Sequence, residues 1–242
     1  MPDELENFMQ TQRPTAERPL LGLTVLVVED SRFACEAIRL LCLRSGARIR
    51  RADSLRSAAR HLSVYRPVVA IVDLGLPDGS GADLIRKLVT AVPRVSVVLG
   101  TSGDNNAQSI ALQAGADGFL EKPIVSLAAF QSQVLRHLPR SRRPTRPHRV
   151  PDDTVSPDPL ALREDLSHVR EILQDGAPDD DIAAYAAQFL GGLARLAGDP
   201  SLECAARQLE EHCRLGEPIR RDIRKISDML QSHLQGERAA FG

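Results

Sequence analysis

The chain has 242 residues, 43% hydrophobic content and a formal net charge of −1, which is enough for one mid-sized domain and a second small one. No apolar run approaches the length of a membrane span, and the first residues lack a signal-peptide core, so we expect a cytoplasmic protein without membrane contact. Four cysteines occur on predicted helices without a CxxC pair: Cys35, Cys42, Cys204 and Cys213. This arrangement favours small buried side chains over metal ligands or disulfides.

The pattern along the chain begins with an arm and continues as alternating strands and helices. Residues 1–22 mix Pro, Gln, Thr and charges without periodicity, which predicts a disordered arm. Strands are predicted near 24–28, 48–52, 68–72, 95–99 and 118–120. Helices are predicted near 31–45, 54–64, 81–91, 105–115 and 126–138. Five βα units of this kind predict an α/β domain over 23–138 with a doubly wound, five-stranded parallel sheet.

Polar side chains follow four of these strands at the point where each strand ends. They are Glu29 and Asp30, then Asp73, then Thr101, and finally Lys122, which precedes a proline. The carboxyl ends of parallel strands share one edge of the sheet, and ligands bind at that edge in open α/β folds. We therefore expect these five side chains to converge.

The residue types that meet there indicate phosphoryl chemistry. Glu29, Asp30 and Asp73 would repel one another unless a hard cation lay among them, which predicts a Mg²⁺ site. Asp73 is the candidate nucleophile, and Lys122 is the candidate counter-charge for the phosphoryl oxygens. Thr101 is a candidate switch that hydrogen-bonds a phosphoryl oxygen. Singly, such residues are more typical of turns and helix caps, so the prediction rests on their joint order.

Residues 23–138 resemble the receiver domain of two-component response regulators, which has a flavodoxin-like fold. The resemblance makes Glu29 and Asp30 the acidic pair, Asp73 the phosphoacceptor and Thr101 the switch hydroxyl. It also implies a Mg²⁺-dependent phosphoacceptor with self-catalysed dephosphorylation, rather than an enzyme in the usual sense.

Further positions extend this resemblance. The backbone carbonyl of Gly75 would complete the metal shell, and Phe119 occupies the place of a rotating aromatic residue. Lys122-Pro123 matches the family's lysine and its proline, whose peptide bond is cis. The loop after the acceptor also matches, through Leu76-Pro77, Gly79 and Gly81.

A linker is predicted over 139–157, where prolines disfavour both helix and strand. Its first part carries five arginines and no acid: Arg140, Arg142, Arg143, Arg146 and Arg149. A solvated spacer, extended by proline and charge repulsion, is the favoured interpretation. Contact with nucleic acid or an acidic protein surface is the alternative.

Four amphipathic segments follow, and short connections between them predict a C-terminal all-α four-helix bundle over 158–236, with a tail over 237–242. The apolar stripes are Leu162, Leu166, Val169, Leu173; Ile182, Ala186, Phe189, Leu193, Leu196; Leu202, Ala206, Leu209, Cys213; and Ile219, Ile223, Ile226, Leu230. The boundary signals are Pro159, Pro200 and Pro218 in first turns, Asp158 and Asp199 as caps, and Gly176 and Gly216 at helix ends.

Residues 186–218 resemble the core of a histidine phosphotransfer domain, with Gln188 in place of the phosphorylated histidine and Gly191 in place of a usual lysine. A glutamine amide cannot accept a phosphoryl group as imidazole does, so the resemblance implies a degenerate bundle kept for docking. Gly191 and Gly192 cost roughly 1.6–2 kcal/mol relative to alanine inside a helix. They would either leave a smooth patch beside Gln188 for a partner, or fit a crowded crossing within the bundle or ease a bend in the helix.

The charge of this region bears on its partners. Residues 151–242 contain 18 Asp or Glu and 10 Lys or Arg, a net charge of −8, whereas DNA-binding domains present a basic face. We therefore predict a response regulator of a two-component phosphorelay. It would take phosphate on Asp73 from a histidine kinase or phosphotransfer protein and signal through protein contacts, with a kinase, another receiver or a second copy of itself.

Phosphorylation is expected to move Thr101 and Phe119 and to remodel the face made by the fourth helix, fifth strand and fifth helix. The bundle would be tethered beside that face through Arg136 and the linker. Two alternatives stay open: a phosphate sink or relay intermediate with the bundle as scaffold, and a DNA-binding transcriptional regulator, for which salt-dependent DNA binding is the check.

Overall fold

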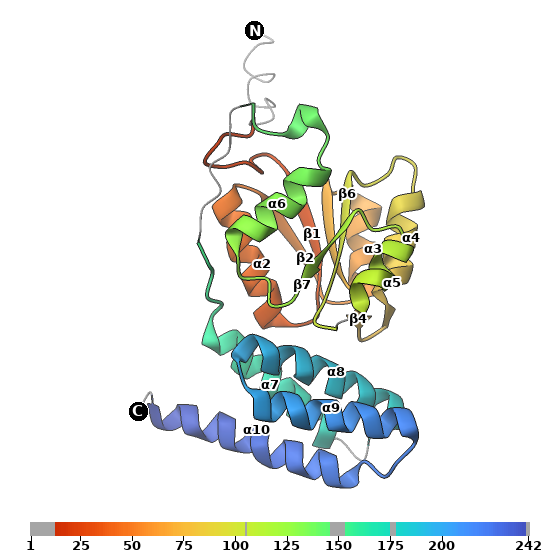
Figure 1. Ribbon diagram of the computed structural model, residues 1–242, viewed down its shortest axis with the longest axis vertical. Coiled ribbons are helices and arrows are strands. Elements are labelled where there is room, and N and C mark those ends of the chain that lie inside the picture. The colour runs from red at the N-terminus through yellow and green to blue at the C-terminus, as the bar shows by residue number, and fades with distance from the viewer. Residues whose placement is uncertain (1–12, 105, 146–152, 175–177, 241–242) are drawn as a thin grey trace.

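The computed structural model describes residues 13–104, 106–145, 153–174 and 178–240, with backbone alone for 236–240. Figure 1 shows an α/β part with a parallel sheet at its centre and a group of helices lying below the sheet. The two parts meet at the carboxyl ends of the strands.

Five parallel strands form the main sheet in the order β2-β1-β3-β6-β7. Their bounds are Thr24–Val28 for β1, Arg48–Ala52 for β2, Val69–Asp73 for β3, Val97–Ser102 for β6 and Gly118–Glu121 for β7. The strand order reverses between β1 and β3, and such a switch point opens a crevice at the carboxyl ends of the two strands. The predicted α/β fold class is confirmed.

Helices cover both faces of the sheet, because the central strands present apolar side chains to both faces. On one face, α2 (Arg32–Ser45) and α6 (Leu127–His137) pack on the strands. On the other face lie α3 (Leu55–Val64), α4 (Gly81–Thr90) and α5 (Ala107–Gln113). A small hairpin, β4 (Gly75–Leu76) with β5 (Gly79–Ser80), follows β3. Serine side chains cap four of these helices: Ser31, Ser54, Ser80 and Ser126.

The predicted arm and linker differ from expectation where the structure describes them. Leu20, within the arm expected to be disordered, is fully buried in the core beside α2, and its amide donates to the carbonyl of Ser45 at 2.9 Å. In the linker, Val155 is buried and its amide donates to the carbonyl of Val125 at 2.9 Å. Apolar side chains therefore hold both segments on the domain at Leu20 and Val155, whereas Asp153 and Thr154 are exposed. The linker's Arg146 and Arg149 lie outside the described residues.

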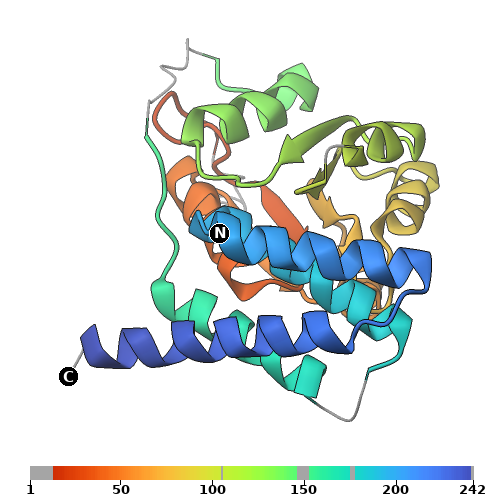
Figure 2. The same cartoon turned by 60° about the horizontal axis from the view of Figure 1, so that its bottom comes forward.

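Four helices make up the described C-terminal part of the chain, here called the helical region: α7 (Pro159–Gln174), α8 (Asp180–Ala197), α9 (Pro200–Leu215) and α10 (Arg220–Ala240). They share one apolar core, and Figure 2 shows α10 running alongside the others. Asp158 and Asp199 accept hydrogen bonds from the first helical amides of α7 and α9, as expected. Gly216 ends α9 in the left-handed conformation at φ 68°. Gly176 lies outside the described residues.

Some apolar positions differ from the prediction. Ile182 is 46% exposed, whereas Ala183, Ala187 and Leu190 are buried, because α8 is covered by α7, α9 and the α/β part and so buries a wider face than one stripe. Cys204 is exposed, against the expectation of a buried side chain. The helix α10 continues beyond residue 236 into the predicted tail.

The burial of Cys35 and Cys42 and the lengths of the helices agree more closely with the expectations from the sequence. Cys35 and Cys42 are buried, and burial raises the pKa of each thiol to about 12. All four cysteines are free thiols. Within the described residues, none of the helices has the combination of length and apolar character that a bilayer crossing requires.

Candidate functional site at the carboxyl edge of the sheet

The sheet brings the three predicted carboxylates together. Glu29 and Asp30 follow β1, Asp73 ends the adjacent strand β3, and oxygen atoms of the three lie within 4.8 Å of one another. Asp73 is paired in register with Thr101 on β6. Glu29 and Asp73 are 3% and 6% exposed, so their charges are largely shielded from water.

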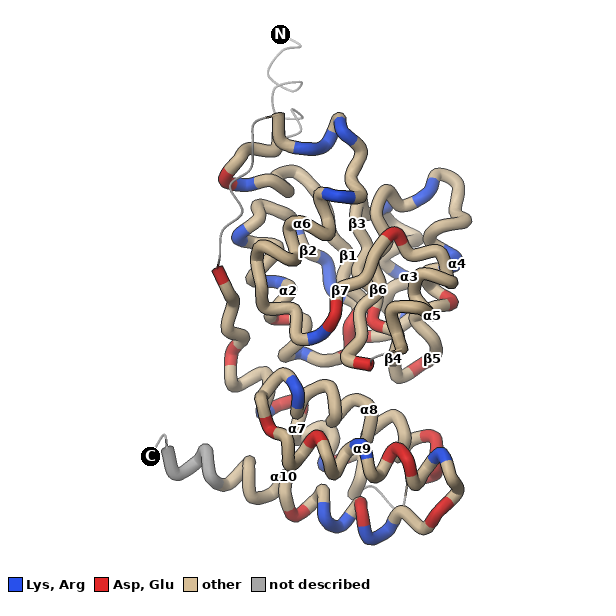
Figure 3. Tube along the Cα trace, in the orientation of Figure 1, with Lys and Arg blue, Asp and Glu red and all other residues tan. Residues whose placement is uncertain are grey.

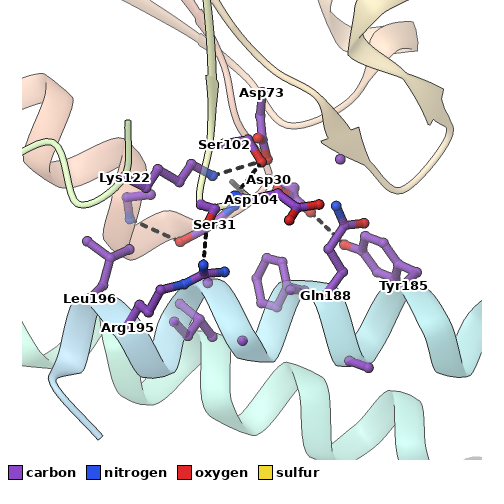
Figure 4. A pocket seen from close by; sticks show the side chains of 18 of the residues that line it. Asp30, Ser31, Asp73, Ser102, Asp104, Lys122, Tyr185, Gln188, Arg195 and Leu196 are labelled. Atoms are coloured by element: carbon purple, nitrogen blue, oxygen red, sulfur yellow. Dashed lines mark hydrogen bonds and ion pairs between the residues drawn. The ribbon is translucent and has the colours of Figure 1, made fainter. Parts of the chain in front are cut away.

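Lys122 supplies the cation at this site. Its Nζ lies 2.8 Å from Oε2 of Glu29 and 3.1 Å from Oδ2 of Asp73. The lysine follows β7, two strands away from Asp73 in the sheet, and the bond to Pro123 is cis. Figure 4 shows the lysine extended toward the acidic group from the side opposite Tyr185.

The electrostatics show an excess of negative charge. Burial raises the pKa of Glu29 well above its usual range, with Asp73 and Asp30 adding to the effect and Lys122 opposing it. Burial and then the charge of Asp73 raise the pKa of Asp30 to about 6. Burial acts to lower the pKa of Lys122, yet the carboxylates of Asp73 and Glu29 raise it overall. One ammonium group does not balance three carboxylates, and the cluster has the donor atoms to hold a metal ion.

Thr101 lies next to Asp73 on the adjacent strand, and Phe119 lies on β7 opposite Gly100. Thr101 is fully buried, and its Oγ1 has no hydrogen-bond partner among the residues that the structure describes. Phe119 is half-buried, and a Cβ added at Gly100 would lie 3.3 Å from its ring. The threonine hydroxyl is therefore a buried donor without an acceptor, a state that is costly unless a ligand completes it.

The glycines after Asp73 have distinct surroundings. A Cβ at Gly81 would lie 1.8 Å from the carbonyl oxygen of Asp73, so the loop requires glycine there. Gly75 lies against the helical region, since a Cβ there would be 2.9 Å from Nε2 of Gln188. The direction of the Gly75 carbonyl toward a metal ion stays a prediction.

A cavity of about 390 Å³ separates the acidic cluster from α8. Its lining includes Asp30, Asp73 and Lys122 from one side and Tyr185, Gln188 and Arg195 from the other. Figure 4 shows the last three rising from one face of α8 toward the strand ends. The helical region therefore covers the carboxyl edge of the sheet.

Two of these residues on α8 make contacts that the sequence did not predict. The hydroxyl of Tyr185 donates to Oδ2 of Asp30 at 2.7 Å, and the guanidinium of Arg195 donates to the carbonyl of Gly103. Tyr185 and Asp30 are 155 positions apart, and no local pattern links two such residues. The expected placement of the helices beside α5, β7 and α6 is wrong, because these contacts hold α8 at the strand ends instead.

The predicted docking residues divide in the same way. Gln188 faces the cavity, whereas Gly191 is buried toward α9, where a Cβ would meet Ala206 at 3.8 Å. A Cβ at Gly192 would meet nothing described within 4 Å. A methyl group therefore fits at both glycines, which excludes the crowded crossing as their reason. Their docking role stays a prediction.

Comparison with known proteins decides what this site belongs to. The sequence model of the family described as "Response regulator receiver domain" matches residues 25–133, which include the acidic cluster, Thr101 and Lys122. These residues are a response regulator receiver domain. Receiver domains interact with histidine kinases or phosphotransfer proteins, and they generally bind Mg²⁺ at an acidic pocket.

Two curated relatives are similar to part of this chain. The chain is 33% identical over 145 residues to the KDP operon transcriptional regulatory protein KdpE of Escherichia coli, covering 59% of each protein. It is 33% identical over 102 residues to the virulence transcriptional regulatory protein PhoP of Salmonella typhimurium, covering 42% of this chain and 46% of PhoP. The chain thus spans about half the length of these relatives.

Solved structures similar to the receiver domain include two from other organisms. One is the signal receiver domain of a signal transduction histidine kinase from Syntrophus aciditrophicus, with 28% identity, a TM-score of 0.44, and coverage of 48% of this chain and 89% of that one. The other is a CheY-like response regulator receiver domain protein from Methanospirillum hungatei, with 20% identity, a TM-score of 0.42, and coverage of 46% and 90%.

Proposed function

We propose that the chain is a response regulator of a two-component phosphorelay that accepts a phosphoryl group on Asp73 from a histidine kinase or phosphotransfer protein. In this proposal, residues 23–138 form the receiver, 139–157 the linker and 158–236 the helical output domain. The observation that carries the proposal is the buried acidic cluster with Lys122 between Glu29 and Asp73. Such a cluster opposes ionisation unless positive charge is added, and phosphoryl transfer requires that same positive charge.

The residues present fit a Mg²⁺ ion. Three carboxylates with oxygens within 4.8 Å of one another form a hard-donor set. Burial, with neighbouring negative charge adding to it, raises the pKa of Glu29 and that of Asp30. Glu29, Asp30, Asp73 and the carbonyl of Gly75 would hold the ion. When bound, Mg²⁺ supplies charge neutralisation for the phosphoryl oxygens and orients them.

The chain's own side chains would carry out the transfer. An oxygen of Asp73 forms a bond to phosphorus as the bond from phosphorus to the donor's imidazole nitrogen breaks. Lys122, already 3.1 Å from that carboxylate, stabilises charge on the phosphoryl oxygens. The partnerless hydroxyl of Thr101 donates to one of those oxygens, and the half-buried Phe119 turns inward as the threonine moves. Water attack on the phosphorus of the aspartyl phosphate breaks its bond to the Asp73 oxygen, releases inorganic phosphate and returns the unmodified carboxylate.

Phosphoramidate tests the acceptor directly. Full-length protein incubated with this small donor and Mg²⁺ is expected to gain one phosphoryl group, which intact mass spectrometry detects and hydroxylamine removes. Asp73→Asn should abolish the gain, because the amide is a poor nucleophile. Asp83→Asn, at an exposed carboxylate on α4, is the matched control and should retain it. Equal incorporation in Asp73→Asn would overturn the proposal.

The helical output domain is proposed to act through protein contacts as a pseudo-phosphotransfer domain. Gln188 faces the receiver's own acidic pocket, which supports a docking role, and a glutamine cannot carry the phosphoryl group onward. Mapping of phosphate on phosphorylated full-length protein under conditions that preserve phosphohistidine is expected to find none at His168, His212 or His233. Stoichiometric phosphohistidine at any of them would favour an active relay instead.

A transcriptional role is the second candidate, and the names of the curated relatives favour it. The linker arginines are its basic feature. Acidic residues on α7, α8 and α9 argue against it (Figure 3), as does the net charge of −8 over 151–242. Filter binding of full-length protein to genomic DNA fragments decides between them. Affinity that falls steeply with salt and with Arg140→Gln, Arg142→Gln and Arg143→Gln together would favour DNA.

A further inference from the structure

The helical region covers the receiver's acceptor pocket. Asp73 is 6% exposed, and the face of α8 that carries Tyr185, Gln188 and Arg195 lies over it. A protein phosphodonor must bring its phosphorus atom to an oxygen of Asp73 along the line of the bond that breaks. The cavity between Asp73 and α8, about 390 Å³ in volume, has room for a small donor but not for the helix of a donor protein. Such a donor and α8 therefore exclude each other.

A buried carboxylate fixes the helical region to the receiver. Asp165 on α7 is 3% exposed. It accepts the hydroxyl of Ser31 at 2.9 Å and the amides of Arg32 and Phe33 at 3.1 and 3.0 Å. These donors form the first turn of α2, where the helix dipole favours an anion. The same turn directly follows the acidic pair, so the attachment point and the acceptor pocket share one segment of chain.

An aromatic anchor lies beside this carboxylate. Phe33 belongs to α2 of the receiver, yet its side chain is 7% exposed and is part of the apolar core of the helical region. Large buried aromatic residues at the centre of a contact carry much of its energy. The contact therefore has both a charged and an apolar element.

The third contact acts on the pocket itself. Tyr185 donates to Oδ2 of Asp30 at 2.7 Å, while the amide of Ser31 donates to Oδ1 at 3.1 Å. Both oxygens of Asp30 are thus engaged while α8 is in place. A cation at the acidic cluster must compete with the tyrosine hydroxyl for one of them.

We propose that the helical region is a cis-acting inhibitor of its own receiver domain, in which α8 occupies the donor's place over Asp73 and Tyr185 withholds an oxygen of Asp30 from the metal ion. The inference rests on the proposed function of Asp73. Because coupling between two sites is reciprocal, any cation or phosphoryl analogue that binds better without α8 must loosen the helical region by the same factor. Phosphorylation would then release the α8 face, which fits a receiver surface, for another receiver.

The experiment uses the full chain and three variants. Phe33→Ala removes the apolar anchor, Tyr185→Phe removes only the hydroxyl, and Leu43→Ala is the control, at a 47% exposed leucine on the same helix as Phe33. Calorimetry measures the Mg²⁺ dissociation constant. Hydrogen exchange of residues 32–34 and 180–197 measures docking, with and without Mg²⁺ and beryllofluoride.

Phe33→Ala and Tyr185→Phe are each expected to lower the Mg²⁺ dissociation constant about tenfold, the size of one hydrogen bond to a charged group. Leu43→Ala should match the wild type. Beryllofluoride with Mg²⁺ should speed exchange in both segments of the wild-type chain. If Phe33→Ala speeds exchange but leaves Mg²⁺ binding unchanged, the helical region does not occlude the pocket. Tyr185→Phe keeps this outcome decisive if Phe33→Ala fails to fold.

Phosphoramidate separates the two proposals. Tighter Mg²⁺ binding in the variants without phosphate on Asp73 would defeat the proposed function and leave the occlusion standing. If all four proteins are phosphorylated on Asp73 at the same rate and bind Mg²⁺ with the same affinity, the helical region does not inhibit the receiver. The proposed function would then still hold.

Discussion

The hydroxyl of Tyr185 donates a 2.7 Å hydrogen bond to Oδ2 of Asp30, which joins the helical region to the acidic cluster of the receiver domain. Burial raises the pKa of Tyr185 above its usual value, and the negative charge of Asp30 adds to the effect. The phenol therefore keeps its proton and remains a donor over the neutral pH range. A change in the charge or ligands of Asp30 therefore acts directly on this hydrogen bond from α8.

Asp165→Asn is expected to loosen the attachment of α7. The amide keeps the shape of the carboxylate but loses the charge that the first turn of α2 favours. Hydrogen exchange at Arg32 and Phe33 should speed by roughly tenfold, since hydrogen bonds to charged groups contribute about 1.5–3 kcal/mol. Glu164→Gln is the neighbouring control. It removes a surface ion pair with Arg32 whose side chains are 46% and 64% exposed, and such pairs contribute little. Equal effects of the two variants would contradict this prediction.

Lys122→Ala is expected to destabilise the metal-free protein by about 3 kcal/mol, because it leaves Glu29 and Asp73 close together without their buried cation. Urea unfolding with and without Mg²⁺ is the measurement. Added Mg²⁺ should recover part of the loss, since it would neutralise the same carboxylates. Lys87→Ala, on the exposed face of α4, should leave the free energy of unfolding unchanged. A loss that Mg²⁺ does not reduce would argue against a metal site here.

Two glycine-to-alanine changes should have opposite signs. Gly192→Ala places a methyl group in open space within α8 and is expected to stabilise the protein by about 1 kcal/mol. Gly81→Ala would force a Cβ to within 1.8 Å of the carbonyl of Asp73, and should destabilise by about 3 kcal/mol. Thermal unfolding of both variants tests this directly. A destabilising Gly192→Ala would show that something approaches that residue closely.

The pair of His212 and Asp222 predicts a pH dependence of stability. His212 Nδ1 lies 2.7 Å from Oδ2 of Asp222, and this hydrogen bond, with Glu217 and Glu211 nearby, raises the pKa of His212. The unfolded value is about 6.5. Because the folded value is higher, the stabilisation is complete below the unfolded pKa and is lost as pH rises through the folded one. The free energy of unfolding should therefore fall as the pH rises above about 6.5.

Variants isolate the histidine in that pH series. His212→Gln should remove this part of the slope, whereas His168→Gln, at an exposed histidine on α7, should keep it. Urea unfolding at each pH gives the slope. The same slope in His212→Gln would assign the dependence to another group.

The sequence by itself determined the α/β fold and the positions around its site. Short Val-rich runs alternating with amphipathic segments specify a buried parallel sheet, and parallel strands carry their carboxyl-terminal residues to one edge. Glu29, Asp73 and Lys122 meet for that reason. The helices of the C-terminal part were equally readable, because Asp199, Pro200 and Gly216 mark their ends.

Only the tertiary structure decided where the helical region lies. Its contacts run from Tyr185 to Asp30 and from Asp165 to the first turn of α2. Each contact joins residues more than a hundred positions apart, and no periodic pattern in either segment predicts its partner. The sequence also does not predict what Phe33 packs against, since an apolar residue in α2 is equally suited to pack on the sheet of its own domain. It packs into the helical region instead, because the two parts bury more apolar surface together than either does alone.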